Sequence, residues 1–139
     1  MTDVQQTGED AQLGVFGPWV TYDFGYRGGN ILPGSVTINR AGQVIPQGHV
    51  RTLVPNLTLP RDAILGLVTL TEAEHFFELP DTISGAGGNP DVASAFITVT
   101  LELEGGPLRD KTVVERPGSH DPRFDQLFAV LTSVSAVIL

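Results

Sequence analysis

The chain has 139 residues, a net charge of −8 and no cysteine, and 41% of its residues are hydrophobic. This length supports one hydrophobic core, and the apolar fraction is too high for a disordered acidic chain. The 8 basic residues are scattered along the sequence, so no basic face neutralises phosphates, and we expect neither a nucleic acid nor a membrane as partner. The absence of cysteine excludes thiol nucleophiles, thiolate metal sites and disulfides.

The N-terminal residues 1–14 are polar, and we expect a disordered lead-in before a single domain that spans residues 15–139. This end of the sequence has neither the basic nor the apolar segment of a signal peptide. No stretch of about 18 apolar residues indicates a transmembrane helix. We therefore expect a cytoplasmic protein.

The first half of the sequence predicts three strands. Alternating apolar residues predict a strand over residues 18–26, and Gly28-Gly29 then breaks the pattern. A second strand is predicted around residues 35–38, followed by a turn at 40–43 with a glycine in its third position. A return strand begins at Val44, and its prolines confine it to an edge of the sheet.

The middle of the sequence changes to helical spacing. Apolar residues over 59–79 predict a helix, with Thr58 as its candidate N-cap and Pro60 in its first turn. The alternative is a break at Thr69 and Thr71, with Thr71 capping a second turn. Pro80 is expected to end this helix, because proline removes a backbone donor and clashes with the preceding turn. A glycine-rich loop is expected over residues 81–90.

The second half predicts a hairpin and a helix. Strict alternation over residues 93–104 indicates a strand, and residues 111–115 return as its antiparallel partner. Asp121 and Pro122 have the positions of an N-cap and a first helical residue. An apolar stripe indicates the C-terminal helix that follows, and it comprises Phe124, Leu127, Phe128, Leu131 and Val134.

The element order is therefore β-β-(β)-α-β-β-α, which predicts the α+β class. We expect a two-layer domain in which an antiparallel sheet of four to five strands carries two helices on one face.

Several of these segments together resemble a known family. They are a Gly-Gly step before a strand, an aromatic pair at a helix end, an alternating strand with its return strand, and a final helix, namely Tyr26-Arg27-Gly28-Gly29, Val36-Thr37-Ile38, Glu74–Pro80, Asp91, Gly105-Gly106, Lys111–Val114, Phe124 and Leu127. Over roughly residues 20–135 the sequence resembles the emfourin group of small proteinaceous inhibitors of thermolysin-like metalloproteases, and related bacterial domains. It departs from that pattern in a longer N-terminus, an insertion-like stretch at residues 47–55 and an asparagine at position 30 in place of an aromatic residue.

The resemblance implies a non-catalytic domain that binds a protein, with a thermolysin-like metalloprotease as the partner. The candidate contact surface consists of Tyr26, Arg27, Gly28, Gly29 and Asn30, with residues 47–55 beside it. At the glycines the backbone can approach a partner closely, and Arg27 can pair with a carboxylate. A plain turn is the alternative interpretation of these five residues.

Two further groups of residues have the residue types of a metal site or a catalytic triad. Glu72 and His75 have a spacing that places both on one helical face, and a metal site would need His49 or His120 beside Glu72. A solvated helix end explains the same spacing, so we expect no metal and no cofactor. Neighbouring side chains diverge, so Ser119, His120 and Asp121 do not form a catalytic triad. We expect no catalytic residue and no enzyme, although a small enzyme that uses Glu72 and His75 stays open.

The last four residues, 136–139, are all apolar. They either pack onto the core or form a surface for self-association. The alternative function is therefore an accessory or self-associating structural module without inhibitory activity, which forms a homo-oligomer through this segment.

Overall fold

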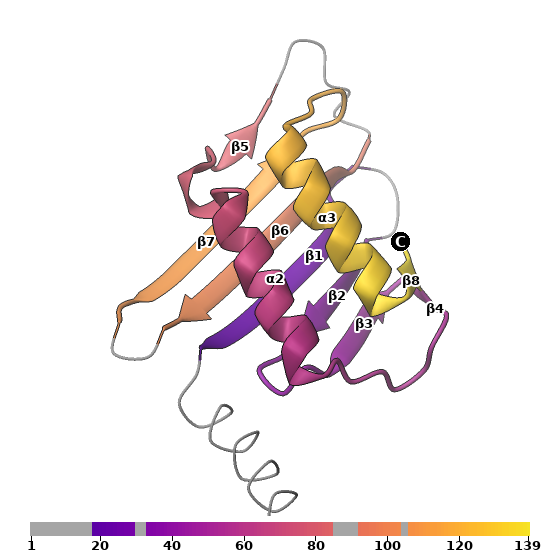
Figure 1. The fold of residues 1–139 in the computed structure, drawn as a ribbon. Coiled ribbons are helices and arrows are strands. Elements are labelled where there is room, and N and C mark those ends of the chain that lie inside the picture. Colours follow the sequence, from indigo (N-terminus) through magenta and orange to yellow (C-terminus); the bar gives the residue numbers. More distant parts are fainter. Residues whose placement is uncertain (1–17, 30–32, 85–91, 104–105) are drawn as a thin grey trace, which may run out of the picture.

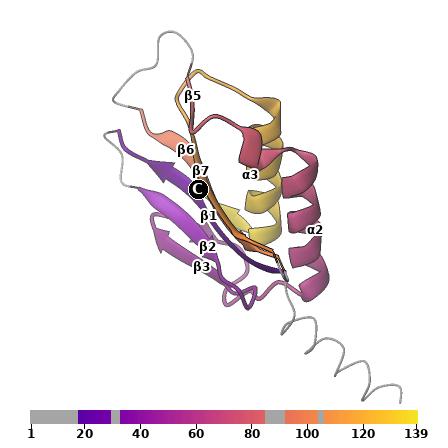
Figure 2. The same cartoon turned by 90° about the vertical axis from the view of Figure 1, so that its left-hand side faces the viewer.

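The computed structural model describes residues 18–29, 33–84, 92–103 and 106–139. A six-stranded sheet forms one layer, and two helices lie side by side across one of its faces (Figures 1 and 2). The expected lead-in at residues 1–14, Asn30 and most of the expected glycine-rich loop lie outside the described residues. No helix in these ranges is long and apolar enough to cross a membrane.

The sheet has the strand order β3-β2-β1-β6-β7-β5. Its first five strands are antiparallel to their neighbours. They are β1 (Trp19–Arg27), β2 (Gly34–Ile38), β3 (Val44–Gly48), β6 (Ser94–Glu102) and β7 (Leu108–Glu115). β1 pairs with β2 on one side and with β6 on the other, so the sheet is built around the first strand of the chain. The expected edge position of the proline-containing return strand is confirmed, because β3 is the outermost strand on its side.

Two short pairings complete the strands. β5 (Thr82–Ile83) joins β7 in parallel at the other edge of the sheet, and β4 (Arg51–Thr52) pairs with β8 (Val137–Ile138) in a separate two-stranded ribbon. The expected α+β class with two helices on one face is confirmed. The expected count of four to five strands is too low, and the sheet is mixed rather than wholly antiparallel, because β5 runs parallel to β7. β5 adds the sixth strand because the N–H groups of Val114 and Arg116 donate to the carbonyls of Asp81 and Ile83, at 2.9 Å each.

The first helix differs from its predicted bounds. α2 spans Arg61–Ala73, and its N-cap is Pro60, whose side chain makes no capping bond, rather than Thr58. The helix ends before Pro80 because His75 adopts a left-handed conformation, with φ 53° and ψ 43°. A short 3₁₀ helix, η1 (Phe76–Glu78), follows and places the Phe76 side chain in the core.

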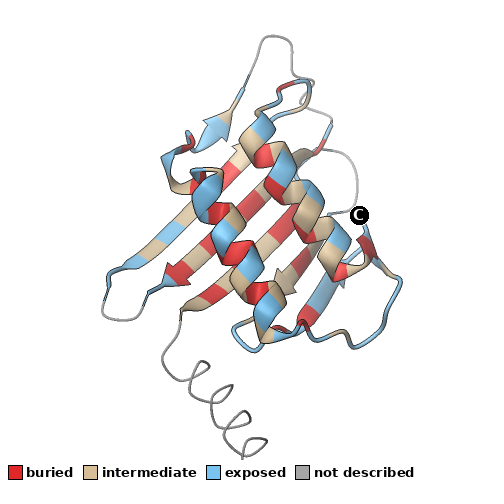
Figure 3. Ribbon diagram, viewed as in Figure 1, coloured by how far each residue is buried: buried red, intermediate tan, exposed pale blue. Residues whose placement is uncertain are grey.

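The second helix, α3 (Pro122–Ser135), begins as expected. The Asp121 carboxylate accepts a hydrogen bond of 2.9 Å from the Arg123 N–H, and Pro122 is the first helical residue. The core lies between the sheet and the helices, as the rows of buried positions in Figure 3 show. Its largest fully buried side chains come from the inward face of the sheet and from both helices, and they include Tyr22, Phe24, Ile97, Leu67, Leu127 and Leu131.

Candidate functional site

The predicted contact turn lies where the central strand β1 ends. Gly28 and Gly29 both have left-handed backbones, with φ 77° and φ 71°, which favour glycine. A Cβ atom added at Gly28 would meet no atom within 4 Å, so packing does not account for the missing side chain. Arg27, Gly28 and Gly29 are exposed, and the structure therefore leaves both the backbone and the guanidinium of this turn accessible to another molecule.

The two residues that precede the glycines contact aromatic rings on opposite faces of the sheet. The Arg27 guanidinium lies 4.8 Å from the centre of the Phe96 ring, on the face that the helices leave open. The Tyr26 ring packs against Phe128 of α3, with 5.6 Å between ring centres. Of the predicted contact residues, Tyr26 is thus half-buried and serves as an anchor, whereas Arg27 and the two glycines are presented to solvent.

The segment at residues 47–55 begins beside this turn, as expected. Gly34 of β2 pairs with Tyr26 on one side and with Gly48 on the other, so the three residues form one row at the same end of the sheet.

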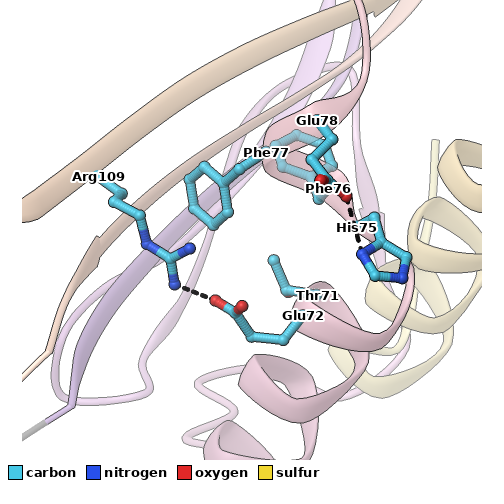
Figure 4. Close-up of a pocket in the computed structure, with 7 residues that line it drawn as sticks. All are labelled: Thr71, Glu72, His75, Phe76, Phe77, Glu78 and Arg109. Atoms are coloured by element: carbon cyan, nitrogen blue, oxygen red, sulfur yellow. Dashed lines mark hydrogen bonds and ion pairs between the residues drawn. The ribbon is translucent and has the colours of Figure 1, made fainter.

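A hollow of about 230 Å³ lies at the C-terminal end of α2 (Figure 4). Its charged side chains make two separate contacts: Glu72 forms an ion pair with Arg109, and His75 Nδ1 lies 2.8 Å from Glu78 Oε2. Arg109 also stacks over the Phe77 ring at 4.4 Å from its centre. The prediction that Glu72 and His75 share a helical face is wrong, because the helix ends before His75.

His120 belongs to a different group of side chains, at the junction of β7 and α3. Its Nδ1 atom lies 3.7 Å from Oε1 of Glu115 and 3.4 Å from Oδ2 of Asp125. Glu115 is the last residue of β7 and is only 7% exposed. Sequence reasoning missed this group, because its members lie on a strand end, a loop and a helix, and no short motif links them.

Burial raises the pKa of Glu115 from its ordinary value of 4.5 to about 7. The hydrogen bond from the Asp121 N–H opposes this rise, and the neighbouring Asp125 carboxylate adds to it. The Asp121 carboxylate itself binds the Arg123 guanidinium, which lowers the pKa of Asp121. Asp121 thus caps α3, as expected, and its carboxylate is engaged by Arg123.

The residues at the C-terminal end of the chain divide between core and surface. Val137 is buried, whereas Ile138 is 49% exposed on the β4–β8 ribbon. The Leu53 N–H donates to the Ala136 carbonyl at 2.8 Å, which brings the exposed Leu53 and Val54 next to this ribbon. Core packing and an exposed apolar surface are therefore both present in this segment.

No protein-family model, curated protein or solved structure matches the chain. The likeness to the emfourin group rests on the residues quoted above.

Proposed function

We propose that this protein is a non-catalytic binding domain that presents the Arg27–Gly29 turn to a protein partner, and that the partner is a thermolysin-like metalloprotease. The observation that supports this turn as the contact surface is the open space around Gly28, which has a left-handed backbone at the end of the central strand. The resemblance to the emfourin group supplies the class of partner. A cytoplasmic location is a part of the proposal, and fractionation of the source cells tests it.

The sheet supports such a role because it orders the residues that lead into the turn before a partner arrives. β1 is hydrogen-bonded on both sides up to Tyr26, which pairs with Gly34 and Ala95. The two aromatic contacts of Tyr26 and Arg27 restrict the side chains as well. A surface that is already ordered loses less conformational entropy when it binds, so more of the contact energy remains as affinity.

Arg27 is the residue that we expect to carry the largest share of binding. Its planar guanidinium can form two parallel hydrogen bonds with a carboxylate of the partner while its other face stays on Phe96. The glycines beside it let the partner's backbone come close, because no side chain stands in the way.

The test is a titration of the full chain into an activity assay of a thermolysin-like metalloprotease. We expect stoichiometric loss of activity with the wild type and at least about tenfold weaker inhibition by Arg27→Ala, since one lost anchor costs about 1.4 kcal/mol or more. Arg40→Ala is the matched control, because the Arg40 guanidinium also stacks on an aromatic ring, at 4.3 Å from the centre of Trp19, which lies at the opposite end of β1 from Arg27.

The two parts of the proposal fail separately in this assay. Full protease activity at micromolar concentrations of the chain rejects the metalloprotease as partner. Inhibition that Arg27→Ala and Arg40→Ala weaken equally rejects the turn as the contact surface, whatever the partner.

The exposed apolar residues of the β4–β8 ribbon favour a second candidate function, a self-associating structural module. Ile138 is exposed on the ribbon, and the exposed Leu53 and Val54 directly follow β4; apolar side chains that gather on a surface mark association sites. If this function is correct, light scattering shows a dimer or larger species that Ile138→Glu dissociates. Leu108→Glu is the matched control, since Leu108 is 60% exposed on a different strand, and a monomer at high concentration rejects this candidate.

A further inference from the structure

The junction between β7 and α3 brings three metal-binding side chains to one point. Glu115 ends the strand, His120 lies in the loop and Asp125 lies in the first turn of the helix. One ligand atom from each of the three lies within 4.8 Å of the others. The group combines an imidazole with two carboxylates, a donor set that first-row divalent cations accept.

The two distances from His120 to the carboxylates are compatible with ligands around an ion. His120 Nδ1 lies 3.4 Å from Asp125 Oδ2 and 3.7 Å from Glu115 Oε1, beyond the length of normal hydrogen bonds. A tetrahedral Zn²⁺ ion with bonds of about 2.0–2.1 Å separates neighbouring ligand atoms by about 3.4 Å. Octahedral Mg²⁺ at about the same bond length would need them about 2.9 Å apart.

The Glu115 carboxylate is itself fixed in a position to bind. Glu115 is only 7% exposed, and its Oε2 accepts a 3.0 Å hydrogen bond from the Asp121 N–H. This bond leaves Oε1 on the side of His120. A buried carboxylate costs free energy unless a cation or a proton neutralises it, and a second carboxylate beside it increases that cost. Ligating carboxylates in metal sites are oriented by outer hydrogen bonds of this kind.

We propose that Glu115 Oε1, His120 Nδ1 and Asp125 Oδ2 form a binding site for a divalent transition metal, with Zn²⁺ as the ion that fits best. This proposal differs from the expectation of no metal that the sequence alone suggested. His120 and Asp125 have side chains that are 74% and 42% exposed, so the ion reaches the site from solvent. Three protein ligands leave the fourth tetrahedral position to water or to a donor from another molecule.

The alternative to a bound metal is a protonated His120 that pairs directly with the two carboxylates. It would neutralise part of the same charge without any metal. The two possibilities differ in one measurement, because only the metal site binds Zn²⁺ more tightly than other acidic and histidine-containing surfaces of the chain.

The experiment is a competition between the untagged full chain and a chromophoric chelator for Zn²⁺ at neutral pH. We expect one equivalent to bind at micromolar affinity or better, and His120→Ala to lower the affinity at least about tenfold. His75→Ala is the matched control, because His75 is also an exposed histidine beside a carboxylate, and we expect its affinity within about twofold of wild type. Circular dichroism checks that each variant is folded, which we expect for the exposed His120.

Two further readouts connect binding to these atoms. Asp125→Asn and Glu115→Gln keep the size of the side chain and should each weaken Zn²⁺ binding, because an amide is a poor ligand. Co²⁺ in place of Zn²⁺ should give the intense visible absorption of a tetrahedral site, and His120→Ala should remove it. Failure of the wild type to compete for Zn²⁺ overturns the proposal, and so does an affinity that His120→Ala leaves unchanged or that His75→Ala lowers equally.

Discussion

The Tyr22 hydroxyl lies 2.8 Å from Oγ1 of Thr71, and this buried hydrogen bond joins the central strand β1 to the helix α2. Thr71 also donates to the Leu67 carbonyl at 2.7 Å, so Tyr22 is the donor to Thr71. Neither side chain is exposed, and burial raises the pKa of Tyr22 above its ordinary value. The two hydroxyls thus satisfy each other inside the core and fix where α2 sits on the sheet.

Removing this bond should destabilise the protein by about 1–2 kcal/mol. Tyr22→Phe leaves the Thr71 oxygen buried without its donor, and Thr71→Val removes the acceptor of the tyrosine hydroxyl. Urea unfolding of both variants and of the double variant measures the effect. Because each single change leaves one polar group unpaired, the double variant should lose less than the sum of the two. Strict additivity would show that the hydroxyls do not interact.

Gly25 and Gly28 should respond very differently to alanine. A Cβ at Gly25 would lie 2.3 Å from the Gly34 carbonyl oxygen of the paired strand, on a backbone with φ 152°. We expect Gly25→Ala to cost at least about 3 kcal/mol, because β1 and β2 must separate. Gly28→Ala carries only the left-handed strain of about 1–2 kcal/mol, since the space around it is open. Thermal unfolding of the two variants compares them directly, and equal losses would contradict this account.

Asp121 should stabilise α3 through its cap. Asp121→Ala removes the acceptor for the Arg123 N–H and should cost about 1–2 kcal/mol in chemical denaturation. Asp121→Asn is the control, because asparagine caps helices about as well and loses only the ion pair with Arg123. A loss as large for asparagine as for alanine would mean that the ion pair, rather than the cap, matters.

Titration of Glu115 should make the stability of the protein depend on pH. Its pKa is raised from 4.5 to about 7 in the folded protein, so the folded state binds the proton more tightly than the unfolded state does. Glu115 therefore makes stability fall as the pH rises from about 4.5 to about 7, and it adds no further slope above that range. Denaturation in the presence of a chelator at several pH values measures this slope. Glu115→Gln resembles the protonated form and should flatten it, so an unchanged slope would exclude Glu115 as its source.

The fold followed from the sequence where one pattern dominated. The alternation in β1 and β6 and the Asp121-Pro122 signal of α3 specify elements that need no distant partner to be recognised. β5 and β8 are two residues long, and they exist only because β7 and β4 lie beside them. Apolar spacing alone did not locate the end of α2, where His75 turns into a left-handed conformation and the buried Phe76 follows in a separate 3₁₀ helix.

The candidate sites divide in the same way. The sequence pattern predicts a turn at Gly28 and Gly29, where the backbone is left-handed, and both residues are exposed, as a contact surface requires. The spacing of Glu72 and His75 was misleading, because it assumed a helix that continues to His75. The meeting of Glu115 with Asp125 depends on the path of the loop between them, which no local pattern encodes.

The central position of β1 has a consequence for how the protein is made. β2 emerges from the ribosome soon after β1 and can pair with it at once, but β6 follows about seventy residues later. Until residue 102 has been synthesised, one side of β1 keeps its backbone donors and acceptors unpaired, next to inward side chains as large as Tyr22 and Phe24. Such an open edge readily pairs with a neighbouring nascent chain. Conditions that slow translation between β3 and β6 should therefore favour aggregation of this protein more than conditions that slow it after β6.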